Sequence, residues 1–241
     1  TNNLANHFLT PKLFLRYSPD HMRKTENGAR LDHLNLFSID RLETYNNFEG
    51  GSSATLGFDY ELEHSSDRNL KISAGQIINQ KNNKNMPSSS SLDRKVSDFV
   101  GNSTLNINEK INLNYNFALD ENYKDLNYNE VGAGFLDNQF KLDVNYLAEK
   151  EHIGNKEYLK TKIEIGKADN GIFSASTKRN LITNSAEYYN LSYEYLNDCL
   201  RAGLVYRREF YNDSELEPEE SLMFQITLTP IGNVNSPSFV K

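Results

Sequence analysis

Alternation of apolar and polar residues recurs along most of the chain and is the feature that most constrains its fold. The clearest example is residues 111–119, INLNYNFAL. A second is residues 219–229, EESLMFQITLT, whose one face carries Leu222, Phe224, Ile226 and Leu228. A period of two places alternate side chains on opposite faces of a β-strand. We count about twelve such strands and no helical pattern, so the sequence predicts an all-β antiparallel fold.

The composition bears on whether the apolar faces meet a protein core or lipid. Only 37% of the 241 residues are hydrophobic, although there are 14 Tyr and 13 Phe. A soluble domain of this size is usually apolar in about half of its residues. A soluble β-sandwich or propeller also has alternating strands. The strands are long, their polar faces are rich in charged residues and Asn, and aromatics such as Phe99, Tyr189 and Phe210 stand near strand ends. These features favour an outer-membrane β-barrel.

The connections between the predicted strands alternate between short and long. Short turns are expected at 65–68, 108–110, 137–138, 168–171 and 197–198, and longer loops at 18–51, 80–95, 150–157, 180–186 and 212–218. The turn near 121–124 is the exception, because it is short where a long loop is expected. In outer-membrane barrels the short turns are periplasmic, so the last strand is expected to run toward the periplasm.

Two stretches are predicted to be poorly ordered. Residues 1–11 are polar, and we expect them to be frayed, with a short strand only at 12–17. Residues 80–95, QKNNKNMPSSSSLDRK, are of low complexity and contain four consecutive serines. Such composition predicts an exposed and mobile loop.

Several function classes are disfavoured by the sequence. The net charge of −7 leaves no basic stripe for nucleic acid. No apolar run is long enough for a membrane-spanning helix. All five histidines are predicted in loops or turns, and their spacing indicates neither a metal site nor a Ser–His–carboxylate set. No phosphate-binding loop motif occurs. We therefore predict no cofactor, no metal and no enzymatic activity. The chain starts at Thr1 rather than Met, so we expect a fragment or a processed product.

Several segments resemble the C-terminal half of the lipopolysaccharide-assembly outer-membrane protein family LptD. They are KLFLRYSP, RLDHLNLFSIDRL, FEGGSSATLG, YEYLNDCLRAGLVYRREF and the final LTPIG. The resemblance is carried at the N-terminal end by Arg16, Tyr17, Pro19, Asp32, Asn35, Leu36, Phe37, Arg41, Glu49, Gly50 and Gly51. It implies that residues 1–241 form the C-terminal part of a larger barrel, with a long external or lumenal loop at 18–51 and a periplasmic tail at 230–241.

The resemblance also implies a function. LptD-like proteins are translocons that insert lipopolysaccharide into the outer leaflet through a lateral gate between the first and last barrel strands. The implied partners are an LptE-like lipoprotein plug, an LptA-like periplasmic bridge reached through an N-terminal domain, and outer-membrane lipid. The strand with Leu222, Phe224, Ile226 and Leu228 would then be one lip of the gate, with a free edge. A general porin or a barrel enzyme is the alternative.

Two sets of residues are singled out as candidate sites. Cys199 is a small buried hydrophobe on the simplest interpretation. The resemblance implies instead a disulfide to a cysteine in the N-terminal domain, although family members often carry two adjacent cysteines and here Leu200 follows. In loop 18–51, Arg41 is predicted to pair with Asp32 or Glu49 and so to order the loop, the alternative being a solvated loop. The set predicted to order this loop is Asp32, Asn35, Phe37, Arg41, Glu49, Gly50 and Gly51.

Overall fold

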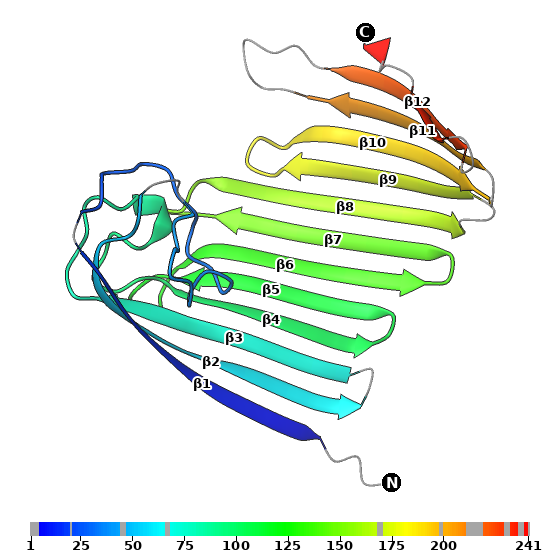
Figure 1. The fold of residues 1–241 in the computed structure, drawn as a ribbon. Helices are drawn as coiled ribbons and strands as arrows, with labels where there is room; N and C mark the ends of the chain where they lie inside the picture. Colours follow the sequence, from blue (N-terminus) through cyan, green and yellow to red (C-terminus); the bar gives the residue numbers. More distant parts are fainter. Residues whose placement is uncertain are drawn as a thin grey trace. The chain divides into compact units, whose positions relative to one another are not determined.

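The chain folds into antiparallel β-strands with almost no helix (Figure 1). The computed structural model describes residues 5–19, 21–43, 47–65, 68–167, 171–197, 200–210, 219–228, 232–235 and 239–240. The described strands are β1 (Asn6–Ser18), β2 (Gly51–Ser65), β3 (Arg68–Asn79), β4 (Phe99–Asn108), β5 (Ile111–Leu119), β6 (Leu126–Asp137), β7 (Phe140–Glu149), β8 (Lys156–Lys167), β9 (Gly171–Asn180), β10 (Ser185–Leu196), β11 (Leu200–Glu209), β12 (Glu220–Leu228), β13 (Gly232–Asn235) and β14 (Phe239–Val240). One 3₁₀ turn, η1, covers Ser88–Ser90. The predicted all-β antiparallel fold is confirmed.

The strands pair in the order of the sequence. The hydrogen-bonded order runs from β1 to β13, and β14 pairs with β12. The chain divides into two compact units: residues 1–131 with 147–156, and residues 132–146 with 157–241. Among the described residues, the long connections that carry buried side chains lie in the first unit, which is the unit that matters for the candidate site.

In the first unit, one face of the sheet is apolar. Leu62 lies opposite Leu70, Leu70 opposite Leu105, and Leu105 opposite Leu113, so that a row of leucines crosses four strands. Leu56 and Leu113 are half or one-third exposed. Exposed leucines in register are costly in water but favourable in a bilayer, as expected for the outer face of a membrane barrel. Phe99, at the start of β4, contacts the rings of Phe117 and Tyr123.

The opposite face of the same strands is polar, and its side chains form hydrogen bonds and ion pairs with one another. Asn116 accepts a hydrogen bond from Asn102 at 2.5 Å and donates one to Glu130 at 2.8 Å. Lys71 pairs with Glu61 at 2.6 Å. We call this surface, on β1–β6, the polar face.

The second unit repeats the pattern of one apolar and one polar face. Tyr189 packs edge-on against Phe210, with ring centroids 5.7 Å apart. Lys178 pairs with Glu187 at 2.7 Å across β9 and β10. Its strands are thus specified by the same period-two pattern as those of the first unit.

The N-terminal strand is longer than predicted. β1 begins at Asn6, so residues 6–11 are not frayed, and every residue of β1 pairs with β2. His7 therefore lies in a strand and its Nδ1 is 2.8 Å from the hydroxyl of Tyr60. His64 lies in β2. The prediction that all histidines fall in loops or turns was wrong for these two, because the pairing of β1 with β2 reaches His7 and because β2 itself continues to Ser65.

The serine-rich loop is partly buried: Met86, Pro87, Ser90, Ser91 and Leu92 are buried, whereas residues such as Lys81 and Lys84 are exposed. Leu92 and Ser90 are fully buried, and Ser91 and Met86 are at most 5% exposed. Ser90 donates its hydroxyl hydrogen to the carbonyl of Pro87, and the Ser91 hydroxyl accepts from the amide of Asp98 at 2.6 Å. The prediction of an exposed loop was wrong for this part, because small hydroxyl side chains satisfy the backbone of a tightly folded loop as well as they satisfy a solvated one.

The outer edge of β12 is not free. Residues 225–228 pair with β13, and Ser221 and Leu222 pair with β14. The expectation of an open edge was therefore wrong: two short pieces of the C-terminal segment lie along it.

Candidate functional site

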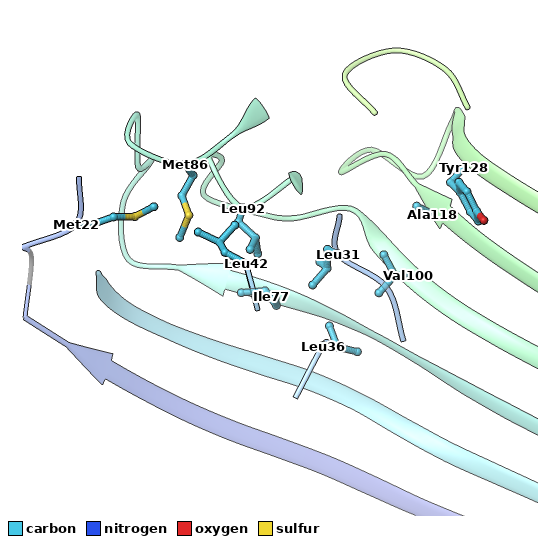
Figure 2. Packing of buried hydrophobic residues seen from close by; sticks show 10 residues of the cluster. All are labelled: Met22, Leu31, Leu36, Leu42, Ile77, Met86, Leu92, Val100, Ala118 and Tyr128. Atoms are coloured by element: carbon cyan, nitrogen blue, oxygen red, sulfur yellow. The ribbon is translucent and has the colours of Figure 1, made fainter. Parts of the chain in front are cut away.

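Three connections gather at one end of β1–β6 and cover the polar face there (Figure 1). We call residues 21–43, 47–50, 80–98 and 150–155 the loop cap. Its interior is apolar and includes Met22, Leu31, Leu36, Leu42, Met86 and Leu92, which meet Ile77, Val100, Ala118 and Tyr128 of the sheet. Figure 2 shows these side chains converging from the loops and the strands. The long connections are therefore part of a folded core.

Backbone hydrogen bonds join the two larger loops of the cap. The amide of Thr25 donates to the carbonyl of Asn85 at 3.0 Å, and the amide of Leu31 donates to the carbonyl of Ser90 at 3.3 Å. Asn79 on β3 donates its side-chain amide to the carbonyls of Leu92 and Arg94. The loops are thus tied to each other and to the strand beneath them.

Asp32 and Asn35 close a tight turn in the first loop. The Asp32 carboxylate accepts from the amides of Leu34 and Asn35 at 2.8 and 3.0 Å. The Asn35 side chain accepts from the amide of Asp32 and donates to the carbonyls of Arg30 and Arg41. Asp32 is therefore occupied by the backbone, as short polar side chains often are in turns.

Arg41 pairs with Glu49, one of the two partners that the sequence left open. Its Nε donates to Glu49 Oε2 at 2.7 Å and its Nη2 donates to Glu49 Oε1, in a bidentate arrangement. Nη2 also donates to the hydroxyl of Ser53 on β2 at 3.0 Å. Arg41 is 0% and Glu49 2% exposed.

Arg16 on β1 adds a second cation to this pair. It donates to the carbonyls of Glu49 and Ile39, and its Nη1 is 3.6 Å from Glu49 Oε1. One carboxylate thus ties both ends of the first loop to β1 and β2. Gly51 begins β2 with φ +98°, a conformation that glycine adopts freely; Gly50, just before it, is half-buried.

Phe37 and its neighbour Leu36 lie on two glycines of the polar face. Gly57 and Gly75 stand directly opposite each other on β2 and β3. A Cβ atom at Gly75 would be 2.7 Å from Leu36 Cδ2, and one at Gly57 would be 2.9 Å from Phe37 Cζ. The glycines therefore leave the depression into which these two side chains fit.

A buried polar cluster joins the second loop to the third, and no motif in the sequence indicates it. His152 Nε2 is 2.9 Å from Asp98 Oδ2, and Asn127 donates to the same oxygen at 3.1 Å. The other ring nitrogen of His152 is 3.4 Å from Arg94 Nη2. The contacts described for this histidine include no serine hydroxyl, so the cluster lacks the geometry of a Ser–His–Asp set.

Two further groups of the cap have pKa values shifted by burial. Burial lowers the pKa of His33, although the neighbouring Asp32 opposes the shift. Burial raises the pKa of Asp93, and the charge of Arg94 opposes that shift. Both shifts favour the neutral form, which is cheaper to bury. Within the described ranges, no three His, Cys, Asp or Glu side chains are grouped as metal ligands.

The other predicted site residues lie in the second unit. On β12, Leu222 and Phe224 are nearly half exposed and Ile226 is half-buried. Leu228 pairs with Leu200 of β11 and Gly232 of β13. Cys199 lies outside the described residues. The structure therefore brings the loop residues of the N-terminal set together in the first unit. The β12 residues belong to the second unit.

Comparison with known proteins gives the family. A comparison with curated proteins found no match. In the part of the chain that the structure describes, no helix has the length and apolarity that a membrane-spanning helix needs. The family description "LptD: LPS transport system D" matches residues 1–193. Because this match covers most of an all-β chain with one apolar and one polar face, the chain belongs to the LptD family and is an outer-membrane β-barrel component of lipopolysaccharide transport.

Proposed function

We propose that the chain forms the C-terminal part of a larger barrel and that β12 is one lip of a lateral gate for lipopolysaccharide. The observation that carries this proposal is the unequal pairing of β12. Its inner edge pairs with β11 along its whole length, whereas the pairing described for its outer edge is with two short segments, 232–235 and 239–240. A strand held strongly on one edge and weakly on the other can part from its outer neighbour without unfolding the sheet.

The remaining parts of the chain have roles that follow from this proposal. The loop of residues 18–51 lies on the external or lumenal side, and the short turns lie in the periplasm. An LptE-like lipoprotein occupies the lumen, and an LptA-like bridge delivers lipopolysaccharide through an N-terminal domain. The loop cap supports a transport role over that of an open porin, because folded side chains cover the polar face at one end of the strands.

The gate is tested by locking it with a disulfide in the full-length protein. Phe224 is replaced by cysteine and combined with a cysteine at each position of the first barrel strand in turn. We expect export of newly made lipopolysaccharide to stop when the lock forms and to resume after reduction. The matched control places cysteines at Leu204 and Phe224, which are direct partners on β11 and β12, and should leave export unchanged. Undiminished export with the first lock formed would rule the gate out.

Cys199 offers a separate test of how the chain joins the rest of the protein. We expect it to form a disulfide with a cysteine of the N-terminal domain, because the periplasm is oxidising. Full-length protein should change mobility on a gel when it is reduced, and Cys199→Ser should abolish that change. An identical mobility with and without reductant would contradict the disulfide.

A further inference from the structure

A polar cavity of about 580 Å³ lies in the loop cap. It is lined by the first loop, by Ser89, by Tyr128 of β6 and by the connection between β7 and β8. Its charged lining residues are Arg30, Asp32, Glu43, Glu149 and Lys156. The volume is within the range of small-molecule sites, roughly 300–1,000 Å³. All lining residues belong to the first unit.

Glu149 stands between the two cations of the cavity at distances that exclude direct hydrogen bonds. Its Oε1 is 3.9 Å from Arg30 Nη1, and its Oε2 is 3.7 Å from Lys156 Nζ. A direct hydrogen bond between such groups is shorter, about 2.7–3.2 Å. Separations of this length leave room for a small polar group that contacts both charges.

Arg30 is held in place by the aromatic ring of Tyr128. Its guanidinium lies 3.3 Å from the centre of the Tyr128 ring, and the Tyr128 hydroxyl donates to Glu130 at 2.9 Å. Gly154 leaves room for the carboxylate of Glu149, because a Cβ atom at that position would be 2.8 Å from Glu149 Oε2. The side chains of Arg30 and Glu149 are 25% and 17% exposed. The guanidinium of Arg30 is thus held before any ligand arrives, which lowers the entropic cost of binding.

We propose that this cavity binds a neutral, hydroxyl-rich saccharide. A hydroxyl group both donates and accepts, so one sugar hydroxyl can donate to Glu149 while it accepts from Arg30 or Lys156. Hydrogen bonds to charged partners are stronger than those between neutral groups. Leu34, which is 79% exposed, and Ile153 provide an apolar rim for the C–H face of a sugar ring.

The charge of the lining sets the choice of saccharide. Three carboxylates face two cations, so a phosphorylated or carboxylated sugar would meet a net negative site. This inference rests on the proposed transport function and deepens it, since the ligand would be the uncharged sugar units of the transported lipopolysaccharide. The cavity would hold these units as they pass the cap.

The test uses the full-length protein with its lipoprotein partner in detergent. The probe is the lipid-free oligosaccharide released by mild acid from the host's lipopolysaccharide and then dephosphorylated, and binding is followed by calorimetry. Glu149→Gln keeps the shape of the side chain and removes its charge. We expect the dissociation constant to rise about tenfold, as when one hydrogen bond to a charged group is lost. Glu151→Gln is the matched control, because Glu151 is exposed in the same connection and does not line the cavity.

Each outcome decides the inference. An unchanged affinity in Glu149→Gln, no binding to the wild-type protein, or displacement of the oligosaccharide by inorganic phosphate would overturn it. A change confined to Glu149→Gln supports it, provided that limited proteolysis shows the loop cap to be folded as in the wild type. Depletion of the full-length protein, scored by surface lipopolysaccharide, tests the proposed transport function separately, so failure of one experiment is distinguishable from failure of the other.

Discussion

Replacing Arg41 by alanine is expected to lower the free energy of unfolding by about 3 kcal/mol, the lower end of the range for breaking a buried ion pair. The change leaves the carboxylate of Glu49 buried without its bidentate partner. The cost stays at the lower end because Arg16 Nη1, 3.6 Å from Glu49 Oε1, still gives that carboxylate a positive neighbour. Urea unfolding of the full-length barrel in phospholipid vesicles measures the change, and tryptic cleavage within residues 21–43 should increase.

Two further variants identify the buried charge as the cause. Arg201 pairs with Glu194 at 2.9 Å, but both side chains are well exposed, at 55% and 38%. Arg201→Ala should therefore cost less than about 1 kcal/mol. Adding Glu49→Gln to Arg41→Ala removes the unpaired charge, so the double variant should cost less than the sum of the two single ones. Strict additivity, or equal costs for the Arg41 and Arg201 variants, would refute this account.

Replacing Gly75 by alanine is expected to cost about 1–3 kcal/mol, as overpacking of a filled site does. The new Cβ atom would lie 2.5 Å from the carbonyl oxygen of Leu56 and 2.7 Å from Leu36 Cδ2. Neither contact is tolerated, so the spacing of β2 and β3 must change and Leu36 must leave its position on the polar face. The same unfolding measurement gives the free energy, and faster proteolysis of the first loop would report the displacement of Leu36.

Gly203 on β11 provides the matched control for Gly75. The nearest heavy atom to a Cβ at Gly203 would be the carbonyl oxygen of Tyr193, 4.0 Å away. Gly203→Ala fits without a clash, and it should be neutral or stabilise by up to about 1 kcal/mol by restricting the unfolded chain. If the two alanine variants had the same effect, the depression at Gly57 and Gly75 would not be what seats the loop.

The strands were predictable because their signal is local. In β5, the large apolar residues Ile111, Leu113, Tyr115, Phe117 and Leu119 are each two positions apart, and this spacing alone gives the element and its two faces. The same holds for β12, whose observed range, Glu220–Leu228, lies within the predicted 219–229. β1 was underestimated because Pro11 and the polar residues around it break the alternation, whereas pairing with β2 extends the strand to Asn6.

The sequence thus determined the strands and their two faces, because the alternation lies in neighbouring residues. It also singled out Arg41 and Glu49, because both belong to short motifs of the first loop. The tertiary structure alone decided how the connections fold. Glu49 rather than Asp32 pairs with Arg41 because the Asp32 carboxylate caps its own turn. His152 meets Asp98, 54 positions earlier in the chain, and the serine-rich loop is partly buried because Leu92 reaches the core beneath the first loop. Such contacts join residues that are distant in the chain, so burial and partner choice depend on the packing of the whole loop cap on the polar face.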